Sequence, residues 1–207
     1  MKKIFILLAV LFIYLAANKL IMAQEKEETN SLKNTAFIII DIQNFYFPGG
    51  SLPLFEPEKA AQNAQELLKI CRQNDILVIH VRHNASSGSE IHSLVKPIEG
   101  EKIISKDKAN SFVGTDLLEY LNENNIKNLI ICGMQTHMCL EAATRAASDY
   151  GFSCTVIEDA CTTRDLKFGD NLVLAKDVHY STLSTLNKTY AEIKTTKEIL
   201  NEIKNQE

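Results

Sequence analysis

The feature that most constrains the fold is the alternation of short apolar runs with helical segments after residue 34. The apolar runs lack the polar–apolar alternation of half-exposed strands, which is typical of strands buried on both faces. Strands and helices that alternate in this way form a parallel sheet covered by helices. The sequence therefore predicts an α/β fold with three layers (α/β/α) around a doubly wound, mostly parallel sheet of six strands.

Element boundaries follow from the periodicity and from cap and turn residues. The predicted strands cover residues 35–40, 76–81, 102–105, 128–132, 153–158 and 190–193. The predicted helices cover residues 58–73, 116–124 (with Thr115 as N-cap), 138–150, 171–185 and 196–204. Between them, residues 159–170 are expected to form a loop in which Arg164 and Asp165 have structural roles.

The N-terminal segment has the pattern of a secretory signal peptide. Lys2 and Lys3 precede an uninterrupted apolar stretch at residues 4–17, and Ala23 ends a small-residue cleavage point. We expect residues 1–23 to be a signal peptide, 24–34 a flexible leader and 35–207 the folded domain. The protein would then be exported, to the periplasm, without a stable membrane anchor. A retained anchor is the competing interpretation, although the apolar run is short for a transmembrane helix.

Charge and cysteine content exclude several classes of function. The formal charge is −4, and because residues 1–23 contain three lysines and no acidic residue, the remaining chain has a formal charge of −7. This charge argues against nucleic acid as a partner. The five cysteines contain no C-x-x-C pair, so neither a zinc site nor a disulfide framework is indicated.

Cys139 stands where a strand gives way to a helix. The apolar run at 129–132 breaks at Gly133, and an alanine-rich segment follows at 141–147. A thiol at a helix start lies near free backbone N–H groups and the positive end of the helix dipole, both of which favour the reactive thiolate. This pattern indicates a nucleophile. The alternative is a small buried hydrophobic residue, which is how we interpret Cys132 and Cys154.

Asp41 and Lys106 follow two other predicted strands. The carboxyl ends of parallel strands are where ligands bind in open α/β sheets, so these residues and Cys139 are expected to meet at one edge. Taken singly, Asp41 is equally compatible with a turn and Lys106 with a solvated side chain.

These residues lie in a pattern that resembles the isochorismatase-like cysteine hydrolases, a superfamily that includes nicotinamidases, carbamoylsarcosine and ureidoacrylate amidohydrolases and streptothricin hydrolases. The resemblance covers nearly all of residues 35–200 and rests on residues 41–50, 106, 110–112, 131–139 and 159–165. It implies a Rossmann-like fold, a catalytic triad of Asp41, Lys106 and Cys139, and an oxyanion hole formed by the backbone N–H groups of Gln135 and Cys139. It also implies a cis peptide bond between Met134 and Gln135.

The sequence departs from the nicotinamidases at their metal site. Those enzymes carry Asp-x-His after the second strand, where this chain has residues 80–85 without that motif. His80 and His83 remain weak metal candidates because no carboxylate lies nearby in the sequence. We therefore expect no metal and no cofactor. Isochorismatases that cleave a vinyl ether lack the nucleophilic cysteine, so Cys139 favours hydrolysis of a C–N bond.

Residues beside the predicted triad are candidates for binding substrate. Aromatic side chains can wall a small pocket or cap the core, and the loop after the second strand can approach the site or stay in solvent. The candidates are Phe45, Tyr46, Glu90, Phe112, Gln135, Thr136 and His137.

The sequence thus predicts a metal-independent cysteine amidohydrolase that cleaves a small amide, lactam or ureido compound through a thioester. The alternatives are an inactive binding protein with the same fold, an isochorismatase-type hydrolase, or a thiol redox protein, which lacks a nearby resolving cysteine. The resemblance further implies a homodimer or larger homo-oligomer.

Overall fold

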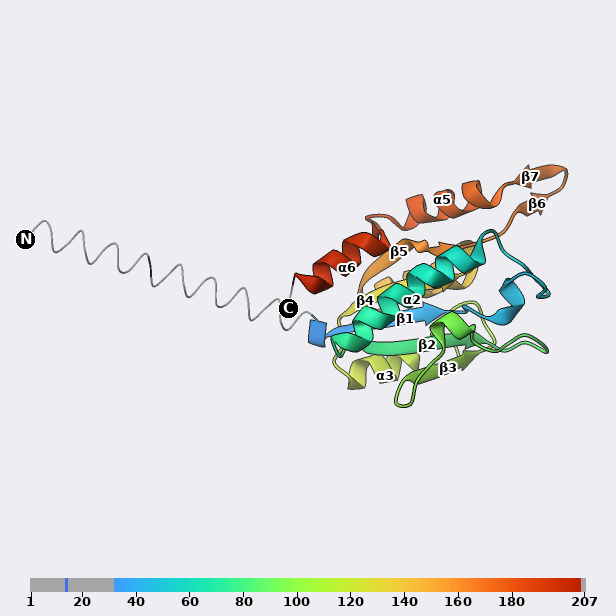
Figure 1. The fold of residues 1–207 in the computed structure, drawn as a ribbon. Coiled ribbons are helices and arrows are strands. Elements are labelled where there is room, and N and C mark those ends of the chain that lie inside the picture. The colour runs from blue at the N-terminus through green and yellow to red at the C-terminus, as the bar shows by residue number, and fades with distance from the viewer. Residues whose placement is uncertain (1–13, 15–31, 206–207) are drawn as a thin grey trace, which may run out of the picture.

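The computed structural model describes residue 14 and residues 32–205. A six-stranded sheet forms its centre, with strand order β3-β2-β1-β4-β5-β8 and every neighbouring pair parallel (Figure 1). The strands are β1 (Thr35–Ile40), β2 (Leu77–His83), β3 (Lys102–Lys106), β4 (Asn128–Met134), β5 (Ser153–Thr162) and β8 (Glu192–Lys194). Because the order reverses direction after β3, β2 and β1, the sheet is doubly wound, and the predicted fold class is confirmed.

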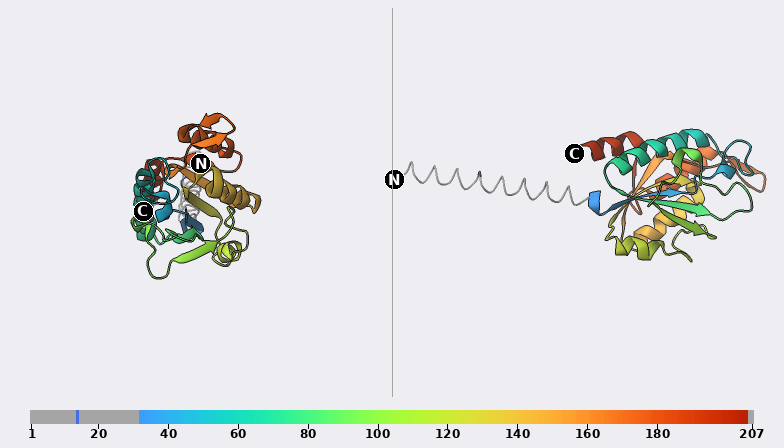
Figure 2. Two further views of the ribbon diagram at one scale, coloured as in Figure 1. Left: turned by 90° about the vertical axis from the view of Figure 1, so that its right-hand side faces the viewer. Right: turned by 60° about the horizontal axis from the view of Figure 1, so that its bottom comes forward.

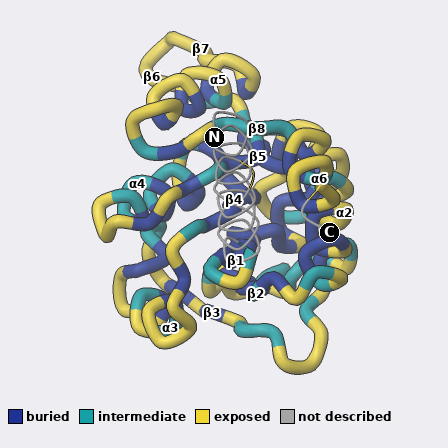
Figure 3. The backbone as a smooth tube through the Cα atoms, turned by 90° about the vertical axis from the view of Figure 1, so that its left-hand side faces the viewer, coloured by how far each residue is buried: buried dark blue, intermediate teal, exposed yellow. Residues whose placement is uncertain are grey.

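Helices cover both faces of this sheet. Figure 2 shows α2 (Pro57–Gln73) and α6 (Thr196–Lys204) on one face and α3 (Leu117–Glu123) and α4 (Glu141–Asp149) on the other. α5 (Ala175–Leu186) packs beside α4. All six residues of β1 are buried, and Figure 3 shows the central strands enclosed between the helices. A strand enclosed in this way needs apolar residues on both faces, which explains the run that the sequence shows.

One predicted helix is partly wrong. The helix expected at residues 171–185 begins only at Ala175, and residues 166–173 form an antiparallel hairpin of β6 (Leu166–Phe168) and β7 (Asn171–Val173). The carboxylate of Asp165 accepts a hydrogen bond from Ala175 N at 2.7 Å and so caps the first turn of α5. Leu172 and Val173 are exposed in the hairpin, so these apolar residues do not form the buried face of a helix.

Smaller differences lie around the site. Residues 159–162, expected in a loop, extend β5. The helix expected from residue 138 is preceded by a π-helical turn, η3 (Thr136–Leu140), and α4 starts at Glu141. Asp116 is the N-cap of α3, although Thr115 Oγ1 still accepts a long hydrogen bond from Leu117 N (3.4 Å).

The end of the predicted leader is part of the folded domain. Asn34 O accepts hydrogen bonds from Lys127 N and Asn128 N at 2.8 and 3.0 Å, and Leu32 packs on the core. The predicted signal peptide lies outside the described residues apart from Tyr14. Within the described part of the chain, every helix is too short or too polar to cross a membrane.

Gly133 permits the close approach of β4 to β1. It adopts φ +128°, and a Cβ there would lie 2.0 Å from Ile40 O. We expect Gly133→Ala to lower the free energy of unfolding by about 3 kcal/mol or more, because the clash is with backbone that cannot move aside. Urea unfolding would measure this. Gly114→Ala is the matched control, since Gly114 has φ +71° but nothing within 4 Å, and should lose only about 1 kcal/mol.

Candidate active site

Asp41 directly follows β1 and turns into the protein. Its backbone has φ +51°, a left-handed conformation that aspartate tolerates better than most residues, and its N–H donates to Val81 O at 2.9 Å. The side chain is fully buried. The sharp change of backbone direction at the end of β1 thus directs a carboxylate to the carboxyl edge of the sheet.

Lys106 ends β3 and forms a buried ion pair with Asp41. Its Nζ donates to Asp41 Oδ2 at 2.8 Å and to Lys108 O at 3.1 Å, and neither side chain of the pair is exposed. Burial raises the pKa of Asp41 above its ordinary value, and the Lys106 charge opposes that rise only in part. A carboxylate with a raised pKa is a better proton acceptor.

Cys139 lies in η3, next to this pair. Its Sγ, a carboxylate oxygen of Asp41 and a ring nitrogen of His83 lie within 4.8 Å of one another. Burial and the neighbouring Asp41 carboxylate raise the pKa of Cys139 to about 12, more than the Lys106 charge lowers it. The helix dipole and the cation favour the thiolate, whereas desolvation and the Asp41 carboxylate, which the sequence pattern does not reveal, favour the protonated thiol.

The turn before Cys139 has the conformation that the resemblance implies. The Met134–Gln135 peptide bond is cis. Gln135 O accepts from the N–H groups of Met138 and Leu140 at 3.0 and 3.3 Å, which closes the turn. The side chain of Gln135 donates to Tyr46 Oη at 3.3 Å, while its Oε1 is buried without a partner in the described part of the protein. The oxyanion hole at the N–H groups of Gln135 and Cys139 stays a prediction.

Of the predicted substrate residues, Tyr46 lies beside the triad, and Phe45 packs against Tyr46. Tyr46 is buried and bonded to Gln135, and the ring of Phe45 meets that of Tyr46 edge-on at 4.3 Å. Burial raises the pKa of Tyr46, so its hydroxyl stays protonated. These contacts place Tyr46 against the turn that carries Cys139.

The other predicted substrate residues have different partners. Thr136 is buried and its Oγ1 lies 2.9 Å from His179 Nδ1 on α5, while His137 Nδ1 lies 2.6 Å from Thr163 Oγ1. Glu90 is exposed, and its backbone carbonyl accepts a hydrogen bond from Asn44 N. Phe112 packs on Tyr150 and Phe152 at the end of α4 remote from Cys139, which favours the alternative that it caps the core.

His80 has a structural partner. It is buried in β2, and its Nε2 lies 2.9 Å from Glu101, which also pairs with Arg72 at 2.7 Å. Burial alone would raise the pKa of Glu101, but hydrogen bonds from Arg72, Ile98 N and His80 outweigh it and lower the pKa to about 2.

This cluster predicts an acid-sensitive contribution to stability. Because the unfolded carboxyl titrates near 4.5, the stability due to Glu101 is present above that pH and is lost as the pH falls from there towards 2. Urea unfolding between about pH 6 and pH 3 should show a loss of about 2 kcal/mol that Glu101→Gln lacks. Equal slopes in both proteins would contradict the prediction.

Two residues near the site were not among the predicted site residues. His83 was considered only as a weak metal candidate, yet it faces Asp41, Lys106 and Cys139. Arg164 was predicted to be structural, but its charge acts on both His137 and Tyr46, and its Nε is buried without a partner among the described residues. The signal for both is spatial, since His83 ends β2 and Arg164 follows β5 by two residues, and both strands end at this edge.

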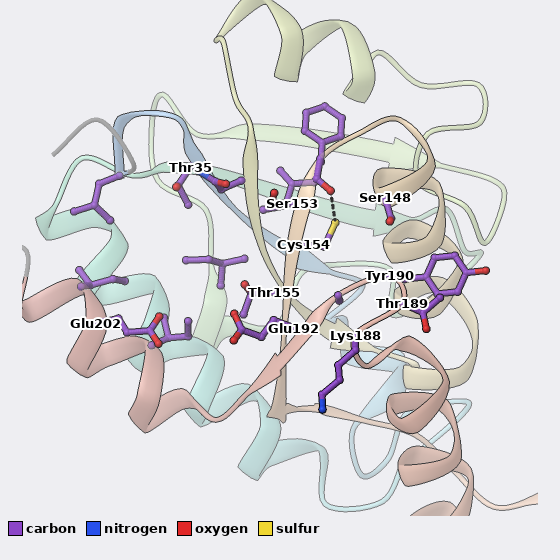
Figure 4. Close-up of a pocket in the computed structure, with 18 residues that line it drawn as sticks. Thr35, Ser148, Ser153, Cys154, Thr155, Lys188, Thr189, Tyr190, Glu192 and Glu202 are labelled. Atoms are coloured by element: carbon purple, nitrogen blue, oxygen red, sulfur yellow. Dashed lines mark hydrogen bonds between the residues drawn. The ribbon is translucent and has the colours of Figure 1, made fainter. Parts of the chain in front are cut away.

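An open cavity of about 570 Å³ lies at the opposite end of the sheet (Figure 4). Thr35, Asn128, Cys154 and Glu192 contribute to its wall, together with residues of α6. These positions are at or near the starts of β1, β4, β5 and β8, so the cavity is separated from the triad by the length of the strands.

Comparison with known proteins agrees with this geometry. Residues 35–198 match the model of the isochorismatase domain. The uncharacterized isochorismatase family protein YddQ of Bacillus subtilis is 45% identical over 80% of this chain and 98% of its own length. The chain belongs to the isochorismatase family. The solved structure of an isochorismatase from Pseudomonas putida is 33% identical, with a TM-score of 0.77 over 81% of this chain and 91% of that one.

Named relatives of this chain include hydrolases. A streptothricin hydrolase of Streptomyces noursei is 26% identical over 63% of this chain and 50% of its own length. A cysteine hydrolase from Pseudomonas syringae has the same fold, with a TM-score of 0.81, 24% identity, and coverage of 84% of this chain and 94% of that one. Membership of this family of isochorismatase-like hydrolases places the chain among hydrolytic enzymes.

Proposed function

We propose that the protein is a metal-independent cysteine amidohydrolase that cleaves a C–N bond in a small amide, lactam or ureido compound. The observation that carries the proposal is the buried Asp41–Lys106 pair, 2.8 Å across, next to the sulfur of Cys139. A base, a fixed cation and a nucleophile in contact are the parts that acyl transfer requires.

In the first half of the proposed reaction, Asp41 takes the thiol proton as Cys139 Sγ attacks the carbonyl carbon. Because the pKa of the resting thiol is about 12, proton transfer accompanies the attack and does not precede it. The tetrahedral oxyanion would be held by the N–H groups of Gln135 and Cys139. Asp41 then returns the proton to the leaving nitrogen, the C–N bond breaks, and an acyl thioester remains on Cys139.

In the second half, water takes the place of the departed amine. Asp41 accepts a proton from the water as its oxygen attacks the thioester, and collapse of the second tetrahedral intermediate breaks the C–S bond. The proton on Asp41 returns to the sulfur, and the product leaves as a carboxylic acid. Lys106 supplies a fixed positive charge throughout and holds the carboxylate in place.

The position of Arg164 favours a substrate whose acyl group carries a carboxylate. Its guanidinium acts on His137 in η3 and on Tyr46, and its Nε has no partner in the described part of the chain. A guanidinium binds carboxylates well. A distant relative, the maleamate amidohydrolase of Pseudomonas putida (22% identical), is named for such a substrate.

The proposed function is tested with the purified domain and a panel of amides, lactams and ureido compounds, in matched pairs with and without a carboxylate. Release of ammonia or amine is measured, and an acyl adduct on Cys139 is sought by intact-protein mass spectrometry. Turnover with an adduct supports the proposal. Binding without turnover of any panel member would favour an inactive binding protein. We further propose, from the N-terminal sequence pattern, that the enzyme acts after export.

A further inference from the structure

His83 occupies a defined place in the candidate site. It is the last residue of β2 and lies opposite Lys106 in the register of β2 with β3. Gln43 fixes its backbone on both sides, since His83 N donates to Gln43 Oε1 at 2.8 Å and Gln43 Nε2 donates to His83 O at 2.9 Å. The backbone of His83 is therefore fixed at the carboxyl edge of the sheet by two hydrogen bonds with the buried side chain of Gln43.

The contacts of Lys106 define the state of this imidazole. Its ammonium has three N–H groups, of which two go to Asp41 and to Lys108 O. The third can reach His83 Nδ1, 3.5 Å away. This is long for a hydrogen bond, but contacts in an active site without substrate often shorten when substrate binds. Since an ammonium only donates, a hydrogen bond here requires that Nδ1 carries its lone pair and that the ring proton lies on Nε2.

A metal ion is the other occupant to consider here. Asp41, His83 and Cys139 offer oxygen, nitrogen and sulfur within 4.8 Å, a set that suits a transition metal. However, the ammonium of Lys106 donates a hydrogen bond to Asp41 and lies next to His83 Nδ1. A divalent cation would lie beside a buried positive charge, which is unfavourable at such short range.

We propose that His83 is a positioning residue, which in its neutral form accepts the third N–H of Lys106 and thereby holds the ammonium against Asp41 and Cys139. Protonation of His83 removes the acceptor and sets two cations against each other. The charged and titratable groups that face His83 are Asp41 after β1, Lys106 at the end of β3 and Cys139 in η3. This proposal rests on the proposed function.

Three variants test the proposal with an amide that the wild-type enzyme hydrolyses. His83→Ala should lower kcat about 10- to 100-fold with little change in KM, an effect typical of a residue that orients a catalytic group. His83→Asn, whose Oδ1 can replace Nδ1 as acceptor, should recover most of that loss. Asn84→Ala, an exposed neighbour bonded to Asp107, is the control.

A readout without substrate separates this proposal from the proposed function. Long-range ¹H–¹⁵N NMR should show His83 as the Nε2–H tautomer at neutral pH, with signals assigned by their loss in His83→Asn, and Lys106→Met should abolish that preference. An Nδ1–H tautomer, or a His83→Ala enzyme with wild-type kcat, would overturn the positioning role. If the panel yields no hydrolysis, the NMR result still decides whether His83 accepts from Lys106.

Discussion

Replacing Cys139 by alanine should abolish amide hydrolysis, with a fall in kcat of at least about 10⁴-fold, because no acyl thioester can form without the sulfur. The variant should fold normally, since the thiol is 6% exposed and small and its loss removes little packing. Rates of product release and the melting temperature would be measured together. Intact-protein mass spectrometry should show the acyl adduct in the wild type and not in Cys139→Ala.

Cys154→Ala is the matched control for this experiment. Cys154 is also buried, burial likewise raises its pKa to about 12, and its Sγ donates only to a backbone carbonyl, Phe152 O. It lies in β5 at the far end of the sheet, so hydrolysis should be unchanged. A Cys139→Ala protein that retains more than about a tenth of wild-type kcat would refute the nucleophile assignment.

The second large effect concerns the Asp41–Lys106 pair. Removing one member of a buried pair leaves the other without its counter-charge, so Asp41→Asn and Lys106→Met should each lower the free energy of unfolding by about 3–5 kcal/mol. The double variant should lose clearly less than the sum of the two. Urea unfolding of the four proteins gives the coupling energy directly, and simple additivity would show that the pair contributes no mutual stabilisation.

The pH dependence of Lys106→Met provides a further check. Without the ammonium, desolvation keeps the pKa of Asp41 well above the unfolded value, so the folded state binds more protons than the unfolded state above about pH 4. Stability should therefore fall as the pH rises from about 4 towards neutrality. Asp41→Asn should lack this slope, and its kcat should fall at least about 10²-fold because the base is lost.

The sequence was sufficient to predict the sheet because its strands are buried on both faces, and a buried strand such as β1 leaves an unmistakable apolar run. The hairpin of β6 and β7 was missed for the opposite reason. Phe168 and Leu172 are exposed, so the positions of these apolar residues are not set by burial in the core. Their spacing is therefore compatible with a helix as well as with a hairpin. Local patterns predict elements reliably only where burial determines the residue type.

The sequence predicts which residues form the catalytic triad, but it does not predict the pKa of Cys139. Asp41 and Cys139 follow strands and Lys106 ends one, and the polarity of a parallel sheet brings such residues to one edge. The raised pKa of Cys139 depends on burial and on a carboxylate 98 positions away in the sequence, which no local pattern contains. The sequence does not indicate the proposed positioning role of His83, because that role depends on its distance from Lys106 in the folded protein.

The polarity of the strands also has a practical consequence. The folded domain begins at the edge where β1 starts, anchored by Asn34, whereas the three reacting groups lie at the edge where the strands end (Figure 1). A purification tag, a fusion partner or a solid support joined upstream of Leu32 would thus attach on the side facing away from the reacting groups. Immobilisation by that route should leave small molecules free to diffuse to the nucleophile, which makes the protein suitable for flow-based screening.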